Sequence, residues 1–286
     1  MEGLGLVDGK FVGLDEYVVP IEDRGHLFGD GVYEAVVVWG SKPFMVVEHM
    51  ERMFNSAALI RMDLPYTLEE LIKFHLQLIE KTGFEEALIY SQFTRGVAPR
   101  KHPFPLEVKP RLSMTIRPWV RLDSNLKING AKAVLLPDER WLKCNIKSLN
   151  LLGNVLAKQT ATENGCFEAI LHRDGYVTEG SSSNVFVVKD SVIYTAPTSN
   201  KILAGITRGV ILKLAQENNL ILKEETFSPD FLLAADEVFL TGTTTEIMPI
   251  VSVNNQAIGD GRVGTISKIL HEVYMNIIAR ECHLLP

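Results

Sequence analysis

Cysteine is scarce in this sequence. Cys144, Cys166 and Cys282 are the only three, and no two of them form a CxxC pair. This odd, sparse count argues against a disulfide framework and against a zinc site, so no metal is expected. No apolar run approaches the roughly 18 residues that a membrane-spanning helix needs. The N-terminal stretch contains acidic residues and no basic region of the kind that opens a signal peptide. We therefore expect a protein of the reducing cytoplasm.

The sequence also lacks any stretch in which charges of a single sign are concentrated. The 286 residues carry a formal net charge of −6, and no dense run of Lys and Arg occurs. Nucleic acid and anionic membranes are therefore not expected as partners. Hydrophobic residues make up 46% of the chain and charged residues 22%, which is typical of an ordinary globular protein. The length suggests about two domains.

The first part of the chain alternates strand and helix signals. A hairpin is expected over residues 5–13, with Asp8 and Gly9 at its turn. Thr67 and Glu70 have the spacing of a capping box, which predicts a helix that continues to about Thr82. The other elements expected here are strands at residues 33–39, 43–47, 87–94 and 111–117 and a helix at 48–62.

These signals predict an α/β fold in two parts. Residues 1–119 are expected to form an N-terminal α/β domain in which helices cover a mostly antiparallel sheet. Residues 120–126 have weak periodicity and are expected to be a linker, and residues 127–286 form the C-terminal domain. Strands of the second domain are expected at 132–136, 166–172, 176–179 and 184–188, and a closing helix at 265–280.

Lys147 stands where an extended segment gives way to an amphipathic one. Ser148 or Asn150 can cap a helix that starts there. A lysine held by the backbone at this point can project its amine into a cavity, where burial lowers its pKa and frees the lone pair for Schiff-base chemistry. Most lysines beside apolar runs are surface residues, so this pattern alone leaves both interpretations open. The residues at helical spacing are Leu149, Leu152, Val155, Leu156 and Gln159.

The segment TEGSSSNVF, residues 178–186, places the carboxyl of Glu179 in a β-rich region. A charged residue in such a place lies on the solvent face or pairs with a buried cation, and a pyridinium nitrogen would be such a cation.

Two further stretches have the chemistry of phosphate cradles. Gly205, Ile206 and Thr207 open a helix, where free amides and a hydroxyl can bind an anion. A second turn, residues 241–245 with the sequence TGTTT, is rich in amides and hydroxyls. Helix caps and threonine turns are common, so each turn is compatible with phosphate without requiring it.

A proline-rich loop, RGVAPRKHPFPLEVKP, joins the two strands that close the first domain. Arg100 and His102 lie in its middle, with Lys101 between them. A stiff loop that presents arginine and histidine can receive a carboxylate, because arginine offers a bidentate fork. The alternative is a solvated basic loop.

Taken together and in this order, IKSLNLL, TEGSSSNVF, GITR and TTTEI resemble the fold-type IV pyridoxal-phosphate enzymes over nearly the whole chain. Within that superfamily, EDRGHLFGDGVYE and TRGVAPRKHPFP look most like the bacterial D-amino acid aminotransferases. The resemblance implies a smaller N-terminal α/β domain, a larger C-terminal pseudobarrel domain, and pyridoxal 5′-phosphate as the cofactor. It also implies a homodimer whose subunits share their active sites.

The resemblance assigns residue roles that the patterns alone do not. Lys147 looks like the lysine that carries the cofactor as a Schiff base, and Glu179 like the residue that keeps the pyridine nitrogen protonated. Leu203 resembles the residue that lies against the ring. Gly242 departs from the pattern, which has serine there, and removes one hydroxyl near the phosphate. The expected phosphate ligands are Arg52, Ile206, Thr207 and Thr243, the expected cofactor-site serines are Ser182 and Ser183, and the expected substrate-carboxylate trap is Tyr33, Arg100 and His102.

The resemblance implies reversible transfer of an amino group from D-amino acids, such as D-alanine, to 2-oxoglutarate, giving a 2-oxo acid and D-glutamate. Lys147 is expected to move the Cα proton as a general base. Three related activities remain as alternatives: a branched-chain L-aminotransferase, an (R)-amine transaminase and an aminodeoxychorismate lyase. A protein that binds the cofactor without catalysis is the alternative from another class. Retention of both Lys147 and Glu179 argues against it.

Overall fold

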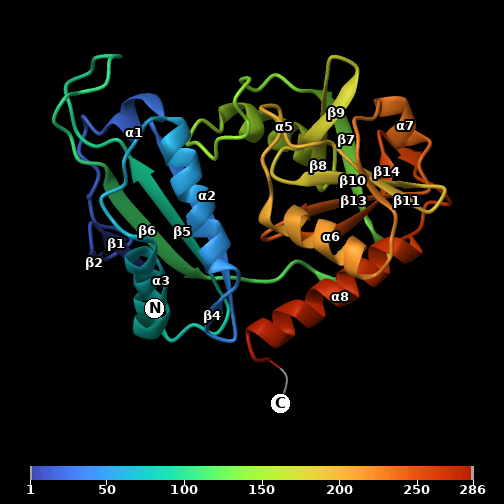
Figure 1. The fold of residues 1–286 in the computed structure, drawn as a ribbon, viewed down its shortest axis with the longest axis horizontal. Helices are drawn as coiled ribbons and strands as arrows, with labels where there is room; N and C mark the ends of the chain where they lie inside the picture. The colour runs from blue at the N-terminus through green and yellow to red at the C-terminus, as the bar shows by residue number, and fades with distance from the viewer. Residues whose placement is uncertain (1, 285–286) are drawn as a thin grey trace. The chain divides into compact units, whose positions relative to one another are not determined.

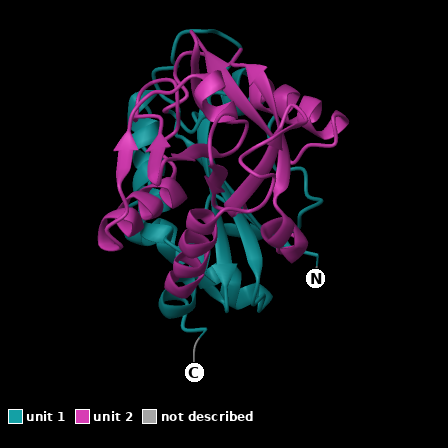
Figure 2. Cartoon of the chain, turned by 90° about the vertical axis from the view of Figure 1, so that its right-hand side faces the viewer, with its two compact units in different colours: residues 1–120, 146–150, 278–286 teal, residues 121–145, 151–277 magenta. Residues whose placement is uncertain are grey.

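The computed structural model describes residues 2–284 (Figure 1). The chain forms two compact units, which Figure 2 draws in separate colours. The first unit combines Met1–Val120 with Ile146–Asn150 and Ile278–Pro286, and the second combines Arg121–Asn145 with Leu151–Ile277. Neither unit is a single continuous stretch of chain. The domain and linker boundaries expected from the sequence stay a prediction.

The first unit is built on a six-stranded sheet in the order β2-β1-β6-β5-β3-β4. Every strand pair in it is antiparallel, as expected from the sequence. The strands are β1 (Leu4–Val7), β2 (Lys10–Val12), β3 (Gly31–Trp39), β4 (Lys42–Pro43), β5 (Ala87–Thr94) and β6 (Arg111–Pro118). The helices are α1 (Arg24–Phe28), α2 (Val46–Leu59) and α3 (Leu68–Thr82).

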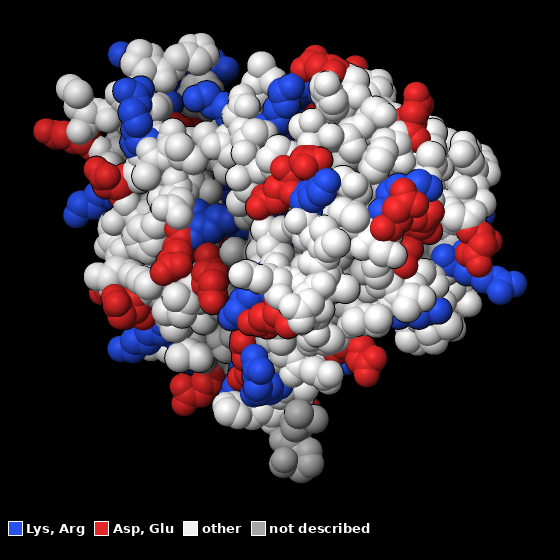
Figure 3. All heavy atoms as spheres, turned by 45° about the vertical axis from the view of Figure 1, so that its right-hand side comes forward, with Lys and Arg blue, Asp and Glu red and all other residues white. Residues whose placement is uncertain are grey.

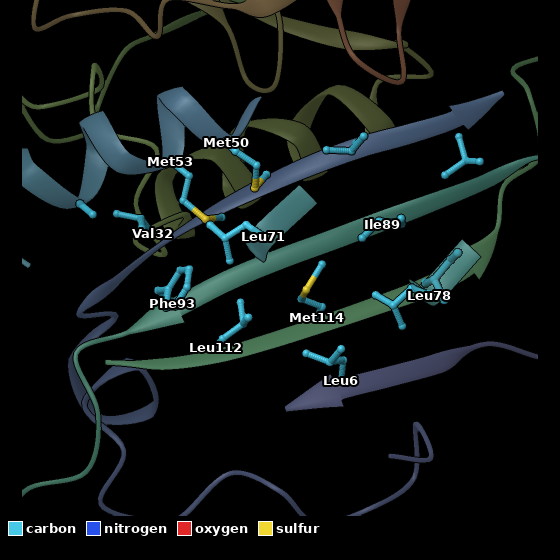
Figure 4. Packing of buried hydrophobic residues seen from close by; sticks show 14 of the residues in the cluster. Leu6, Val32, Met50, Met53, Leu71, Leu78, Ile89, Phe93, Leu112 and Met114 are labelled. Carbon is cyan, nitrogen blue, oxygen red and sulfur yellow. The ribbon is translucent and has the colours of Figure 1, made fainter. Parts of the chain in front are cut away.

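The core of this unit lies between one face of the sheet and the helices α2 and α3. Figure 4 shows labelled side chains of β1, β3, β5 and β6 on the same face as Met50 and Met53 of α2. Each fully buried side chain of this size contributes roughly 1.5–3 kcal/mol through removal from water. The fully buried members include Leu6, Val32, Met50, Met53, Leu71, Leu78, Ile89, Phe93 and Leu112.

Local chemistry fixes two of the predicted features. Asp8 and Gly9 have φ values of 47° and 83°, the left-handed pair that a two-residue hairpin turn requires. At the start of α3, the Thr67 hydroxyl accepts from the Glu70 amide and the Glu70 carboxylate accepts from the Thr67 amide. The predicted hairpin and capping box are both confirmed.

The strand predicted at residues 43–47 is wrong beyond Pro43. β4 ends at that residue, Met45 adopts a left-handed conformation with φ 53°, and α2 begins at Val46. A short apolar run fits either a buried strand or a buried helix, and here the run supplies the first turn of α2.

The second unit is built on a nine-stranded mixed sheet. Its path is β12-β11-β10-β13-β14-β7-β8-β9, and β15 pairs with β14. The sheet curls around its own core, which agrees with the expected pseudobarrel (Figure 1). The strands are β7 (Ala131–Pro137), β8 (Glu168–Arg173), β9 (Tyr176–Gly180), β10 (Asn184–Lys189), β11 (Val192–Thr195), β12 (Leu222–Glu224), β13 (Glu237–Gly242), β14 (Glu246–Val253) and β15 (Gln256–Ala257). The helices are α4 (Ser124–Asn129), α5 (Leu152–Glu163), α6 (Ile206–Glu217), α7 (Pro229–Leu233) and α8 (Thr265–Glu281). The α/β fold class is confirmed.

The helix expected directly after Lys147 begins later than predicted. α5 starts at Leu152, its N-cap is Leu151, and no side chain caps it. Neither Ser148 nor Asn150 is therefore the cap. The backbone of residues 147–149 instead forms hydrogen bonds with the start of β3, so it is extended and cannot enter a helix.

The surface carries charges of both signs. On the face drawn in Figure 3, acidic and basic side chains are interspersed. Within residues 2–284, none of the helices combines the length and apolar character needed to cross a bilayer.

Candidate active site

Lys147 lies in the first unit, beside the N-terminal end of β3. The Tyr33 amide donates to the Lys147 carbonyl and the Leu149 amide to the Gly31 carbonyl, both at 3.0 Å. The Lys147 amide donates to the Ser56 hydroxyl, 3.2 Å away. The backbone of the lysine is therefore fixed on both sides, as the sequence predicted, although by a strand and not by a helix.

The amine of Lys147 lies over an aromatic ring. Its Nζ is 4.3 Å from the centroid of the Tyr33 ring. Among residues 2–284, no carboxylate pairs with Nζ and no hydrogen bond involves it. An amine without an ion-pair partner is available as a nucleophile or a base. The structure thus brings together Lys147 and one expected trap residue, Tyr33.

A buried ion cluster is centred on Glu34, the residue that follows Tyr33 on β3. Glu34 is fully buried, and its carboxylate accepts from Arg52 Nε at 2.7 Å and Arg52 Nη2 at 2.8 Å. His49 Nδ1 lies 2.7 Å from the same carboxylate. Burial alone would raise the pKa of Glu34, but Arg52 and His49 outweigh it and lower the pKa to about 2. Burial also lowers the pKa of His49.

This cluster fixes Arg52, which the sequence assigned to the phosphate. Two of its guanidinium nitrogens are used by Glu34, and the side chain is mostly buried. Sequence analysis missed Glu34 and His49. The available signal was a single glutamate inside the apolar strand YEAVVVW, the same kind of signal that singled out Glu179.

Glu179 lies in the second unit, on β9, and is buried. Its Oε1 accepts from Arg140 Nη1 at 2.6 Å. Its Oε2 accepts from the Leu203 amide at 2.9 Å and from Asn184 Nδ2 at 3.1 Å. Burial raises the pKa of Glu179 to about 7, although Arg140 opposes the rise. The carboxyl thus accepts three hydrogen bonds, and its protonation can respond to a neighbouring charge.

Arg140 links Glu179 to a second buried carboxylate. Its Nε and Nη2 both donate to Asp138 at 2.9 Å. Asp138 also accepts from Arg173 Nη2 at 3.1 Å and from the Thr178 hydroxyl at 2.9 Å. Glu179 therefore belongs to a chain of alternating charges that sequence analysis did not find.

The serines after Glu179 converge on another buried carboxylate. Glu168, on β8, is fully buried and accepts from the hydroxyls of Ser181, Ser182 at 2.9 Å and Ser183 at 3.3 Å. The structure thus turns the two serines assigned to the cofactor, Ser182 and Ser183, toward Glu168. Their cofactor role stays a prediction.

The two turns assigned to phosphate flank unpaired polar atoms. The N-cap of α6 is Gly205, and no side chain caps the amides that follow it. Among residues 2–284, the buried side-chain polar atoms without a partner are Arg208 Nε and the Thr241 hydroxyl. Arg208 lies in the first turn of α6, and Thr241 is the first residue of the segment 241–245 that contains Thr243. An unpaired buried donor is costly, and an anion that accepts a hydrogen bond from it removes the cost.

The loop residues expected in the carboxylate trap lie together in the first unit. The Arg100 guanidinium carbon is 5.1 Å from the centroid of the Phe28 ring. The His102 and Phe28 ring centroids are 5.5 Å apart. Both loop side chains are exposed in the protomer. Phe28, which sequence analysis did not assign, therefore brings the two together.

Comparison with known proteins agrees with this chemistry. The amino-transferase class IV family matches residues 31–253. A D-alanine aminotransferase from Staphylococcus aureus is 47% identical over 273 residues, 95% of this chain and 96% of that protein. One from Bacillus licheniformis is 44% identical over 276 residues, 96% of this chain and 97% of that protein. Among solved structures, the branched-chain amino acid aminotransferase of Escherichia coli superposes with a TM-score of 0.90 at 28% identity, over 97% of this chain and 95% of that one.

The chain belongs to the class IV aminotransferases. It is a pyridoxal-phosphate-dependent transaminase of fold type IV, and the resemblance stated from the sequence is confirmed. The residues present fit this cofactor. Lys147 offers an unpaired amine for its aldehyde, the amides of α6 and the Thr241 hydroxyl offer donors for its phosphate, and Glu179 offers a carboxylate for its ring nitrogen.

Replacement of Glu34 by glutamine is expected to destabilise the protein. The change leaves a buried guanidinium without its carboxylate, which costs about 3 kcal/mol. Urea unfolding of the cofactor-free protein measures the loss. Glu80→Gln, at an exposed position in α3, is the control and should change the free energy of unfolding by less than about 0.5 kcal/mol. Equal stabilities of the two variants would contradict the expectation.

Glu179 is expected to make stability depend on pH. Its pKa is about 7 in the folded protein against a reference of 4.5. Between these values the folded state holds a proton that the unfolded chain releases, so the free energy of unfolding falls as pH rises from about 4.5 to about 7. The expected fall is about 3 kcal/mol. Urea titrations of cofactor-free wild type and Glu179→Gln at several pH values measure it, and parallel profiles would rule it out.

Proposed function

We propose that this transaminase transfers the amino group of D-amino acids reversibly to 2-oxo acids, with D-alanine and 2-oxoglutarate as a substrate pair. The observation that carries the proposal is the pairing of Arg100 with His102 over one aromatic ring, on a loop stiffened by prolines. A guanidinium beside an imidazole suits a substrate carboxylate. Relatives 47% identical over 95% of the chain are D-alanine aminotransferases, which supports the same substrate class.

The cofactor, when bound, supplies a ring that accepts the electron pair of the substrate Cα–H bond. Lys147 then holds the proton at Nζ, because no carboxylate competes for that atom within the described residues. Glu179, fixed by Arg140, Asn184 and Leu203, would hold the ring nitrogen of the cofactor. Ile206, Thr207, Thr243 and Arg52 are proposed as phosphate ligands, Leu203 as the contact to the ring face, and Ser182 and Ser183 as neighbours of the cofactor.

Stereochemistry follows from where the carboxylate is anchored. Lys147 reaches the cofactor from a single side, so the enantiomer whose hydrogen faces it is the one that reacts. Anchoring by Tyr33, Arg100 and His102 selects the D-form. A branched-chain L-aminotransferase is the second candidate, because solved structures with that name have the same fold at 28% identity. The paired Arg100 and His102 favour the D-specific enzyme.

We also propose a homodimer in which the partner subunit supplies Arg100 and His102. Both are exposed in the protomer, which suits residues that act in a neighbouring site. An apolar stripe on α5 is exposed too: Leu152 by 71%, Val155 by 57% and Leu156 by 60%. Such a stripe is the kind of surface that a second subunit covers. A cytoplasmic location, expected from cysteine usage, belongs to the same proposal.

The stereochemical proposal is tested by mixing the purified yellow holoenzyme separately with D-alanine and with L-leucine. The visible band of the bound cofactor is expected to bleach with D-alanine alone. Bleaching by L-leucine alone would keep the cofactor assignment and overturn the D-specific reaction. Bleaching by neither would overturn both amino acid activities.

Arg100→Ala is expected to raise the KM for D-alanine at least about tenfold, because a charge-assisted bidentate contact is lost. Amines without a carboxylate should be affected far less. Equal losses for both substrate types would refute the trap.

Subunit sharing is tested by co-expressing Arg100→Ala with Lys147→Ala. A mixed dimer then holds one site with both residues intact, and D-alanine activity should return to about a quarter of wild type when the subunits combine at random. No recovery in a mixed dimer would show that the trap acts within its own subunit.

A further inference from the structure

The loop that carries Arg100 and His102 is held by a buried arginine. Arg24, on α1, is only 3% exposed. Its Nη1 donates to the Lys101 carbonyl at 2.6 Å and its Nη2 to the His102 carbonyl at 3.3 Å. These two carbonyls belong to the peptide groups on either side of the His102 side chain. The backbone of the expected trap is therefore fixed from inside the first unit, independently of any bound substrate.

Arg24 also stacks against the ring that both trap residues contact. Its guanidinium carbon is 4.8 Å from the centroid of the Phe28 ring, and the Arg100 guanidinium carbon is 5.1 Å from the same centroid. Two guanidinium groups and one imidazole thus share a single aromatic side chain. Cation–π contacts of this kind contribute roughly 0.5–2 kcal/mol each. The side chains of the trap are aligned by Phe28 and their backbone by Arg24.

Asp30 ties Arg24 to the rest of the unit. Its carboxylate accepts from Arg24 Nε at 2.8 Å and from Arg95 Nε at 2.9 Å. Arg95 in turn donates to the Ile60 carbonyl at 2.8 Å and the Arg61 carbonyl at 3.0 Å, at the end of α2.

Arg95 contacts the same stretch of the loop. Its guanidinium carbon lies 3.7 Å from the centroid of the Phe104 ring, two residues beyond His102. Residues 101–104 are thus held by two arginines that share the Asp30 carboxylate.

We propose that Arg24 is a positioning residue for substrate recognition, which sets the Arg100–His102 pair at the geometry that a D-amino acid carboxylate requires. The inference rests on the proposed function, because it gives Arg24 a role in supporting the carboxylate trap that was proposed there. Arg24 is buried, and its side chain binds backbone carbonyls of the loop. It therefore acts on the substrate through Arg100 and His102. Its guanidinium alone can bridge a carboxylate and two carbonyls in one plane, which the compact amine of lysine cannot do.

The test compares Arg24→Met and Arg24→Lys with wild-type holoenzyme. Arg24→Met is expected to raise the KM for D-alanine about 10- to 100-fold, because a displacement of about 1 Å in a positioning group has an effect of that order. The kcat and the affinity for pyridoxal phosphate should stay within about twofold of wild type, since Arg24 contacts neither Lys147 nor Glu179. The KM of Arg24→Lys for D-alanine should lie between the values of wild type and Arg24→Met. Arg111→Met is the matched control, because it removes another arginine–aspartate pair of the first unit, Arg111 with Asp8, and leaves the bonds from Arg24 to the loop carbonyls intact.

Two further measurements separate positioning from general destabilisation. Amide hydrogen exchange of residues 98–106 in the holoenzyme should accelerate at least about tenfold in Arg24→Met and remain unchanged in Arg111→Met. In the Arg100→Ala background, Arg24→Met should add little to the rise in KM, because both changes act on one contact.

The outcomes distinguish this inference from the proposed function. If Arg100→Ala leaves the KM for D-alanine unchanged, the trap itself is wrong. If Arg100→Ala raises the KM but folded Arg24→Met and Arg24→Lys do not, the positioning role alone is overturned. Equal losses of kcat, cofactor affinity and KM in both Arg24 variants also overturn it. If Arg24→Met fails to fold, Arg24→Lys, which keeps the charge beside Asp30, decides the question on the same readouts.

Discussion

The pairing of a buried carboxyl group with a guanidinium is the interaction on which the neighbourhood of the candidate residues depends in each unit. Glu34 with Arg52 and Glu179 with Arg140 each place a carboxyl group away from water. A buried charge left alone costs several kcal/mol, so each partner is required wherever the other is present. An arginine that binds one carboxylate still has N–H groups available to donate to a further group. Arg140 donates to Asp138 in this way, and Arg24 donates to the loop carbonyls.

The features predicted correctly from the sequence are those in which local chemistry decides the structure. The hairpin turn at Asp8 and Gly9 and the capping box of Thr67 and Glu70 involve residues at most three positions apart. The identity of Lys147 and Glu179 came from the resemblance and not from periodicity. Pairing partners such as Arg140 and Glu179 are 39 positions apart, and no local pattern records them. The start of α5 was misplaced for the same reason, because a distant strand, β3, binds the residues that would have begun the helix.

The buried and exposed groups have different tasks in this architecture. Glu34 and Glu179 are buried within their units, where low dielectric and the arginines that pair with them set the protonation of each carboxyl. Arg100 and His102 lie on the surface, and the buried Arg24 binds the backbone of their loop. In the proposed function, chemistry that is common to class IV aminotransferases is kept while this exposed loop adjusts which substrate is received.

The discontinuous first unit has a consequence for how the protein is made and how it can be rebuilt. All six strands of its sheet have been synthesised once residue 118 is added. The segment Ile146–Asn150, which pairs with β3 and carries Lys147, is made later, and the segment that begins at Ile278 is made later still. The unit therefore completes its structure only after the second unit has been synthesised. A fragment cut at residue 120 would contain the whole sheet but not its lysine, so exchange of this unit between related enzymes requires three separate grafts.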